Sequence, residues 1–71
     1  MRERPTEIQA ETLAFIKTFI KENQFPPTFR EIAEHFGISP PTVSQHLDAL
    51  ERKGYITRRN REPRTIVVVR P

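Results

Sequence analysis

Residues 28–54 read TFREIAEHFGISPPTVSQHLDALERKG, a stretch that predicts two helices joined by a tight turn. Thr28 and Glu31 have the spacing of a capping box, in which each side chain accepts a hydrogen bond from the backbone N–H of the other residue. A helix is therefore expected over about residues 29–36. Gly37 follows it, and glycine readily takes the left-handed conformation that ends a helix. The first half of the stretch is thus a short helix with a glycine stop.

The second half of the stretch predicts a longer helix. Ser39 can cap this helix, and the first turn of a helix tolerates prolines such as Pro40 and Pro41. We expect the helix over about residues 40–53, because Gly54 then stops it. A short helix, a turn with glycine and a second helix form the helix-turn-helix pattern, in which the second helix is the recognition helix and enters the major groove of DNA.

A further helix is expected before this stretch, over about residues 7–22. Thr6 and Gln9 form a capping box at its start. Its apolar stripe is built from side chains at spacings of three and four: Ile8, Thr12, Phe15, Ile16, Phe19 and Ile20. The two later helices contribute Ile32, Ala33 and Phe36, and Val43, Leu47 and Leu50. Three helices therefore share one predicted core.

After Gly54 the pattern changes from helix to strand. Residues 55–59 and 65–69 are rich in β-branched side chains, and a polar segment with a proline separates them, so we expect a hairpin over about residues 55–70. The predicted fold is α+β. A three-helix core is followed by a β-hairpin wing, in one winged helix-turn-helix domain over residues 1–71.

Positive charge gathers in the C-terminal part of the chain. The net charge is +3, and seven of the 12 Lys and Arg side chains lie in residues 52–71, beside a single acidic residue, Glu62. Such a segment attracts polyanions, either nucleic acid or an anionic membrane surface. A solubilising tail is the alternative interpretation. The adjoining helix-turn-helix pattern favours double-stranded DNA.

We expect the start of the 40–53 helix to read DNA bases. Thr42, Ser44 and Gln45 lie in its first turns, and a glutamine can form two hydrogen bonds with adenine. Positive side chains at the end of this helix and in the wing suit phosphates, and those in the wing also suit a narrow minor groove. These expected backbone contacts are Arg52, Lys53, Arg59, Arg61 and Arg64.

Three stretches are distinctive: FPPTFREIA at 25–33, HLDALERKGYI at 46–56 and EPRTI at 62–66. With them, the chain from Thr6 to its end resembles the DNA-binding domain of the LexA repressor family. The resemblance implies a winged-helix repressor of the bacterial DNA-damage (SOS) response that binds a palindromic operator as a dimer. It implies base contacts at Ser39, Pro41, Thr42, Ser44 and Gln45. It implies DNA-backbone contacts near Thr28, Arg52, Lys53 and Arg64.

Proteins of that family continue into a serine–lysine self-cleaving domain that also dimerises. The resemblance therefore implies that this chain is the operator-binding part of a longer repressor. We expect the isolated domain to be mainly monomeric, and to dimerise on DNA or through residues beyond Pro71. Two alternatives are a stand-alone winged-helix regulator of another regulon and a winged-helix module that binds protein.

Catalysis, cofactors and metals have no support in the sequence. The chain has no cysteine, and its two histidines, His35 and His46, fall in different expected helices without the pattern of a serine–histidine–carboxylate site. A structural zinc site needs four ligands. No apolar run approaches the roughly 18 residues that a membrane span needs. We expect a DNA-binding protein of the bacterial cytoplasm, at the nucleoid, that is not an enzyme.

Overall fold

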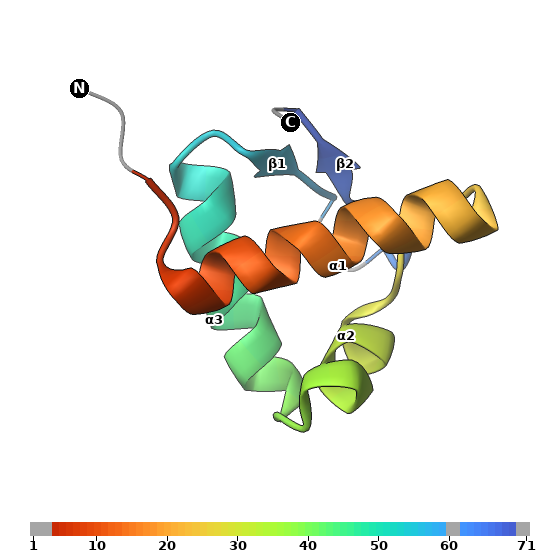
Figure 1. Ribbon diagram of the computed structural model, residues 1–71, viewed down its shortest axis with the longest axis horizontal. Helices are drawn as coiled ribbons and strands as arrows, with labels where there is room; N and C mark the ends of the chain where they lie inside the picture. The colour runs from red at the N-terminus through yellow and green to blue at the C-terminus, as the bar shows by residue number, and fades with distance from the viewer. Residues whose placement is uncertain (1–3, 60–61, 70–71) are drawn as a thin grey trace.

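The computed structural model describes residues 4–59 and 62–69, and it has three helices followed by a small sheet (Figure 1). In chain order the elements are α1 Glu7–Asn23, α2 Phe29–Phe36, α3 Pro40–Arg52, β1 Ile56–Thr57 and β2 Val67–Val68. In Figure 1, α1 crosses in front of α3, and the two strands lie together on the side of α1 away from α2. The expected α+β arrangement of a three-helix core with a β-hairpin wing is confirmed. None of these described helices is long and apolar enough to cross a membrane.

Each helix begins at the cap that the sequence predicts. The capping boxes Thr6–Gln9 and Thr28–Glu31 are both formed, and the Ser39 hydroxyl accepts a hydrogen bond from a backbone N–H in the first turn of α3. These bonds satisfy N–H groups that have no partner within the helix. The helix ends differ from the expected ones by a single residue, since α1 continues to Asn23 and α3 stops at Arg52.

One apolar core joins the helices to the wing. Its most deeply buried aliphatic side chains are Ile16, Ile32, Val43, Leu47, Leu50, Ile56 and Ile66. The stripe predicted for α1 is partly wrong, because Leu13 is buried whereas Ile8 is 38% exposed. Leu13 lies three residues before Ile16 and seven before Ile20, which places it on the same helix face. The buried face of α1 is therefore centred slightly to one side of the predicted stripe.

The wing has a shorter ladder than the sequence predicts. Its two strands pair antiparallel over two residues each, with Ile56 opposite Val68. Toward the tip of the hairpin, the Arg59 N–H donates to the Thr65 hydroxyl at 3.0 Å instead of to a strand carbonyl. This side chain replaces the backbone partner, so the strand pairing ends there.

The turn between α2 and α3 depends on Gly37. Its φ is +68°, and the N–H of the next residue, Ile38, donates to the Ala33 carbonyl at 3.0 Å. This is the predicted left-handed stop. A Cβ added at Gly37 would have no neighbour within 4 Å, so the position requires glycine for its backbone conformation alone.

Replacing Gly37 with Val is expected to lower the free energy of unfolding by about 1–2 kcal/mol, because a β-branched residue is strained at positive φ. Gly37→Asn is the matched control, since asparagine tolerates this region better. Urea denaturation followed by circular dichroism measures both variants. Equal losses of unfolding free energy for Gly37→Val and Gly37→Asn would show that the positive φ is not what requires glycine at this position.

Candidate nucleic-acid interface

The first two turns of α3 carry the polar side chains expected to read bases. Pro41 and Gln45 are exposed there, and Thr42 and Ser44 are half-buried. Ser39, just before the helix, is also exposed, and its hydroxyl lies 2.9 Å from that of Thr42. The fold thus brings all five expected base-reading residues to one end of one helix, while Val43 and Leu47 on the opposite side enter the core.

The residues expected to contact the DNA backbone are of two kinds. Some have exposed side chains, and others already have partners within the protein. Arg52 is exposed at the end of α3, and the Arg59 side chain is 79% exposed, with Glu62 at 3.8 Å from its guanidinium. Lys53 is different, because its Nζ donates to Gln9 Oε1 at 2.8 Å and to the Arg4 carbonyl at 3.2 Å. Lys53 therefore ties the end of α3 to the start of α1.

Thr28 and Arg61 are the remaining residues expected to contact the DNA backbone. Thr28 is half-buried at the start of α2, and its hydroxyl accepts the Glu31 N–H at 3.1 Å. Arg61 lies outside the described residues.

Arg64, an expected DNA-backbone contact from the wing, already has partners within the protein. Its guanidinium donates to both carboxylate oxygens of Glu31, at 2.9 and 3.1 Å, and to the Pro26 carbonyl at 3.0 Å. It also lies 4.6 Å from the centre of the Phe25 ring. A two-pronged guanidinium–carboxylate pair has a fixed geometry. Arg64 therefore fastens the wing to the start of α2, and a phosphate would have to compete with Glu31 for it.

Glu31 is held ionised by these neighbours. The Thr28 N–H, which donates to Glu31 at 2.8 Å, and then the Arg64 guanidinium lower the pKa of Glu31 below its ordinary value of 4.5. Both groups interact more favourably with the carboxylate than with the neutral acid. Glu31 thus serves two junctions, the start of α2 and the attachment of the wing.

Arg58 is a buried cation that the sequence reasoning missed. Its side chain is only 7% exposed, and it forms ion pairs with Asp48 and Glu51 on α3, the latter at 3.4 Å. Its guanidinium carbon lies 5.3 Å from the centre of the Phe29 ring, and burial lowers the pKa of this guanidinium. Strand alternation could have located it, because Ile56 points inward and Arg58 is two residues further on.

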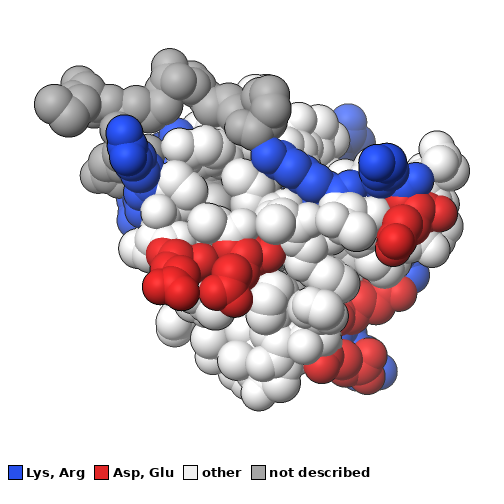
Figure 2. All heavy atoms as spheres, in the orientation of Figure 1, with Lys and Arg blue, Asp and Glu red and all other residues white. Residues whose placement is uncertain are grey.

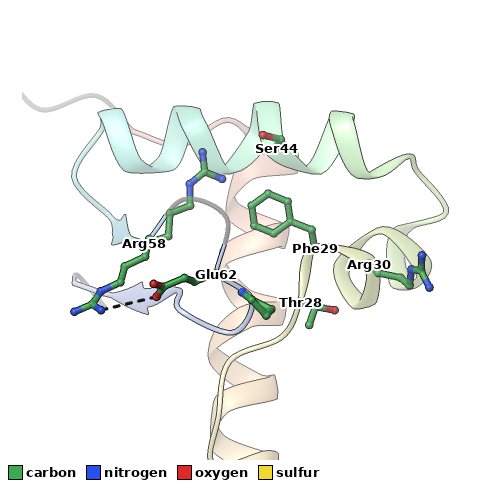
Figure 3. Close-up of a pocket in the computed structure, with 8 residues that line it drawn as sticks. Thr28, Phe29, Arg30, Ser44, Arg58 and Glu62 are labelled. Carbon is green, nitrogen blue, oxygen red and sulfur yellow. Dashed lines mark ion pairs between the residues drawn. The ribbon is translucent and has the colours of Figure 1, made fainter.

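A pocket of about 620 Å³ opens between α2, α3 and the wing. Figure 3 shows Ser44 on α3 facing Phe29, with Thr28 and Arg30 at the start of α2 and Glu62 on the wing. Arg30 is exposed and was not predicted as a site residue. Its sequence signal was weak, since an arginine in the first turn of α2 becomes part of the site only when the wing folds beside it.

The face of the molecule that carries α1 has charges of both signs. In Figure 2, acidic side chains gather over the start of α1, and basic and acidic ones lie next to each other over its second half. A mixed face of this kind has no single field to attract a polyanion. The exposed start of α3, with Arg30 and Arg59 around the neighbouring pocket, is the better candidate for nucleic acid.

The fold and this surface define a winged helix-turn-helix DNA-binding domain. The family model described as the LexA DNA binding domain matches residues 2–65, and the chain belongs to this family. Its relatives include the LexA repressor of Thermotoga petrophila, 51% identical over 63 residues, which are 89% of this chain and 32% of that protein. LexA repressor 1 of Geobacter sulfurreducens is 55% identical over 62 residues, covering 86% of this chain and 31% of that protein. The chain spans about a third of the length of these relatives.

Replacing Glu31 with Gln is expected to lower stability at neutral pH and to change its pH dependence. The pKa of Glu31 is lowered in the folded state, so its contribution is present above about pH 4.5 and is lost as the pH falls through the folded pKa. The stability difference between wild type and Glu31→Gln should therefore shrink in acid, as measured by thermal denaturation across pH. Glu34→Gln, on the same helix, controls for loss of a negative charge. A difference independent of pH would contradict the prediction.

Proposed function

We propose that this domain binds a specific operator in double-stranded DNA and is the operator-binding part of a LexA-like bacterial transcriptional repressor of the SOS response. The observation that carries the proposal is the exposed polar start of α3, held away from the core by the glycine turn. The names of the relatives, which are LexA repressors, support the assignment to the SOS response.

In this proposal, the start of α3 enters the major groove. The residues that read base edges are Ser39, Pro41, Thr42, Ser44 and Gln45. Gln45 has the most specific role, since an amide can donate to and accept from one adenine. The hydroxyls are less selective, and the Thr42 methyl group suits thymine. Ser39 also caps α3, so its contact with DNA would add to a hydrogen bond that it already makes.

The exposed cations are the proposed phosphate contacts. Arg30 and Arg59 flank the pocket between α2 and the wing, and Arg52 lies at the end of α3. Arg61 remains a proposed contact from its position in the sequence. Lys53 and Arg64 are secondary candidates, because each already has partners within the protein. Phosphate contacts of this kind fix the position of the domain on DNA and contribute affinity without sequence preference.

A palindromic operator would let two copies bind together. A single domain of this size has few contacts to offset the free-energy cost of association, so we propose that the isolated chain is mainly monomeric and binds a half-site weakly. Linking two copies, on DNA or through a further domain, would raise the effective concentration of the second copy. The proposed longer protein carries a self-cleaving and dimerising domain and acts at the nucleoid in the bacterial cytoplasm.

Fluorescence-anisotropy titration of the chain onto a palindromic LexA-type duplex and a scrambled duplex, at several salt concentrations, tests the proposal. We expect tighter binding to the palindrome and a linear fall of log affinity with log salt for both duplexes. Binding to both duplexes without preference would contradict the proposed operator specificity for that duplex. Little binding even at low salt would contradict DNA binding altogether.

Gln45→Ala and Arg30→Ala are expected to weaken DNA binding in different ways. Loss of Gln45 should weaken binding to the best duplex by about 1–3 kcal/mol and relax the preference at one base pair. Loss of Arg30 should weaken binding to all duplexes alike and reduce the salt slope by about one. Titration of both variants on the duplexes above measures these effects. A uniform loss of affinity from Gln45→Ala, with selectivity unchanged, would contradict its role in base reading.

A further inference from the structure

Arg58 occupies a position that is unusual for an arginine. It follows β1 directly and turns inward, where its side chain is 93% buried between the wing, α3 and Phe29 of α2. Its Nη2 donates to Asp48 and its Nε lies 3.4 Å from Glu51 Oε1 without forming a hydrogen bond, while its Nη1 has no acceptor among the described residues. Charged side chains are rarely buried to this extent, and leaving buried donors unsatisfied is unfavourable.

Stability alone does not account for an arginine at this position. Exchanging a buried ion pair for apolar side chains of similar volume is often neutral or stabilising, because desolvation of the charges offsets their attraction. Phe29 already provides an apolar wall. An unbranched apolar side chain such as methionine would fill the same space beside it without burying a charge.

The partners of Arg58 indicate a different role. Asp48 and Glu51 lie three residues apart on one flank of α3, and their side chains are 58% and 41% exposed. This flank belongs to the helix that the proposed function places against DNA. Two unpaired carboxylates there would repel the phosphate backbone over distances of about a Debye length, roughly 10 Å at 0.1 M salt.

We propose that Arg58 is a positioning residue for DNA binding, which neutralises the acidic flank formed by Asp48 and Glu51 and holds it against the wing. This inference rests on the proposed function. Arg58 contacts no DNA itself in this role. It acts through the two carboxylates, by reducing their repulsion of the phosphates that approach α3 and by directing them toward the base of the wing.

The proposal predicts an order of DNA affinity set by the charge left on this flank. Arg58→Met removes the cation that pairs with Asp48 and Glu51 and should weaken binding by about three- to tenfold at low salt, with a smaller effect at high salt. Adding Asp48→Asn and Glu51→Gln to that variant should restore the lost affinity. In the wild-type background, Asp48→Asn with Glu51→Gln should bind at least as tightly as wild type, because Arg58 keeps its charge and the carboxylates are gone.

If Arg58 had only a structural role, the Asp48→Asn, Glu51→Gln protein would instead bind DNA more weakly than wild type. Loss of both carboxylates would remove the ion pairs of Arg58, loosen the wing and weaken DNA binding. Anisotropy titrations on one mixed-sequence duplex suffice, because the effect is electrostatic and independent of base sequence. Unfolding of each variant is followed separately by circular dichroism. Glu11→Gln with Glu22→Gln, on exposed positions of α1, makes the same change in net charge away from α3 and is the control.

The outcomes separate this inference from the proposed function. If wild type binds DNA and removing Asp48 and Glu51 weakens binding, the inference is overturned while DNA binding stands. It is also overturned if Arg58→Met binds as wild type does, or if the α1 control tightens binding as much as the α3 pair. If Arg58→Met fails to fold, the Asp48→Asn, Glu51→Gln protein still decides the question, since it retains Arg58. Failure of wild type to bind any duplex would overturn the proposed function instead.

Discussion

The left-handed backbone at Gly37 is the constraint on which the rest of this domain depends. It turns the chain within three residues, so that α3 can begin at the Ser39 cap while both α2 and α3 direct apolar residues into one core. Ile32 from α2 and Val43 from α3 are fully buried as a result. With one side of α3 fixed in the core, its other side and its polar first turns have no position except at the surface.

The described cations of the C-terminal segment do not act as a single field. Arg58 and Arg64 are engaged with carboxylates on α3 and α2, and Lys53 is bonded to the start of α1. Of the cations that the structure describes in this segment, Arg52 and Arg59 remain exposed, and Arg30 from α2 joins them. Among the described residues, the charge available to nucleic acid is therefore distributed over α2, α3 and the wing.

The engaged arginines also explain how so small a wing is held in place. Its ladder has two residues on each strand, and an isolated hairpin is marginally stable in water. Ile56 and Ile66 anchor it to the core, and Arg58 and Arg64 connect its two sides to α3 and α2. Apolar burial supplies attraction without direction, whereas the guanidinium pairs have a preferred geometry that orients the wing.

The helices and their limits follow from the sequence, because caps and turns act over three or four residues: Thr28 with Glu31 and Gly37 with Ala33 are local pairs. The polar start of α3 also follows from the sequence. The roles of the arginines depended on tertiary structure. Arg64 meets Glu31, 33 positions away in the chain. An engaged and a free arginine look alike in a sequence, since an ion pair depends on distance in space, and only the packing of the wing against α2 and α3 sets that distance.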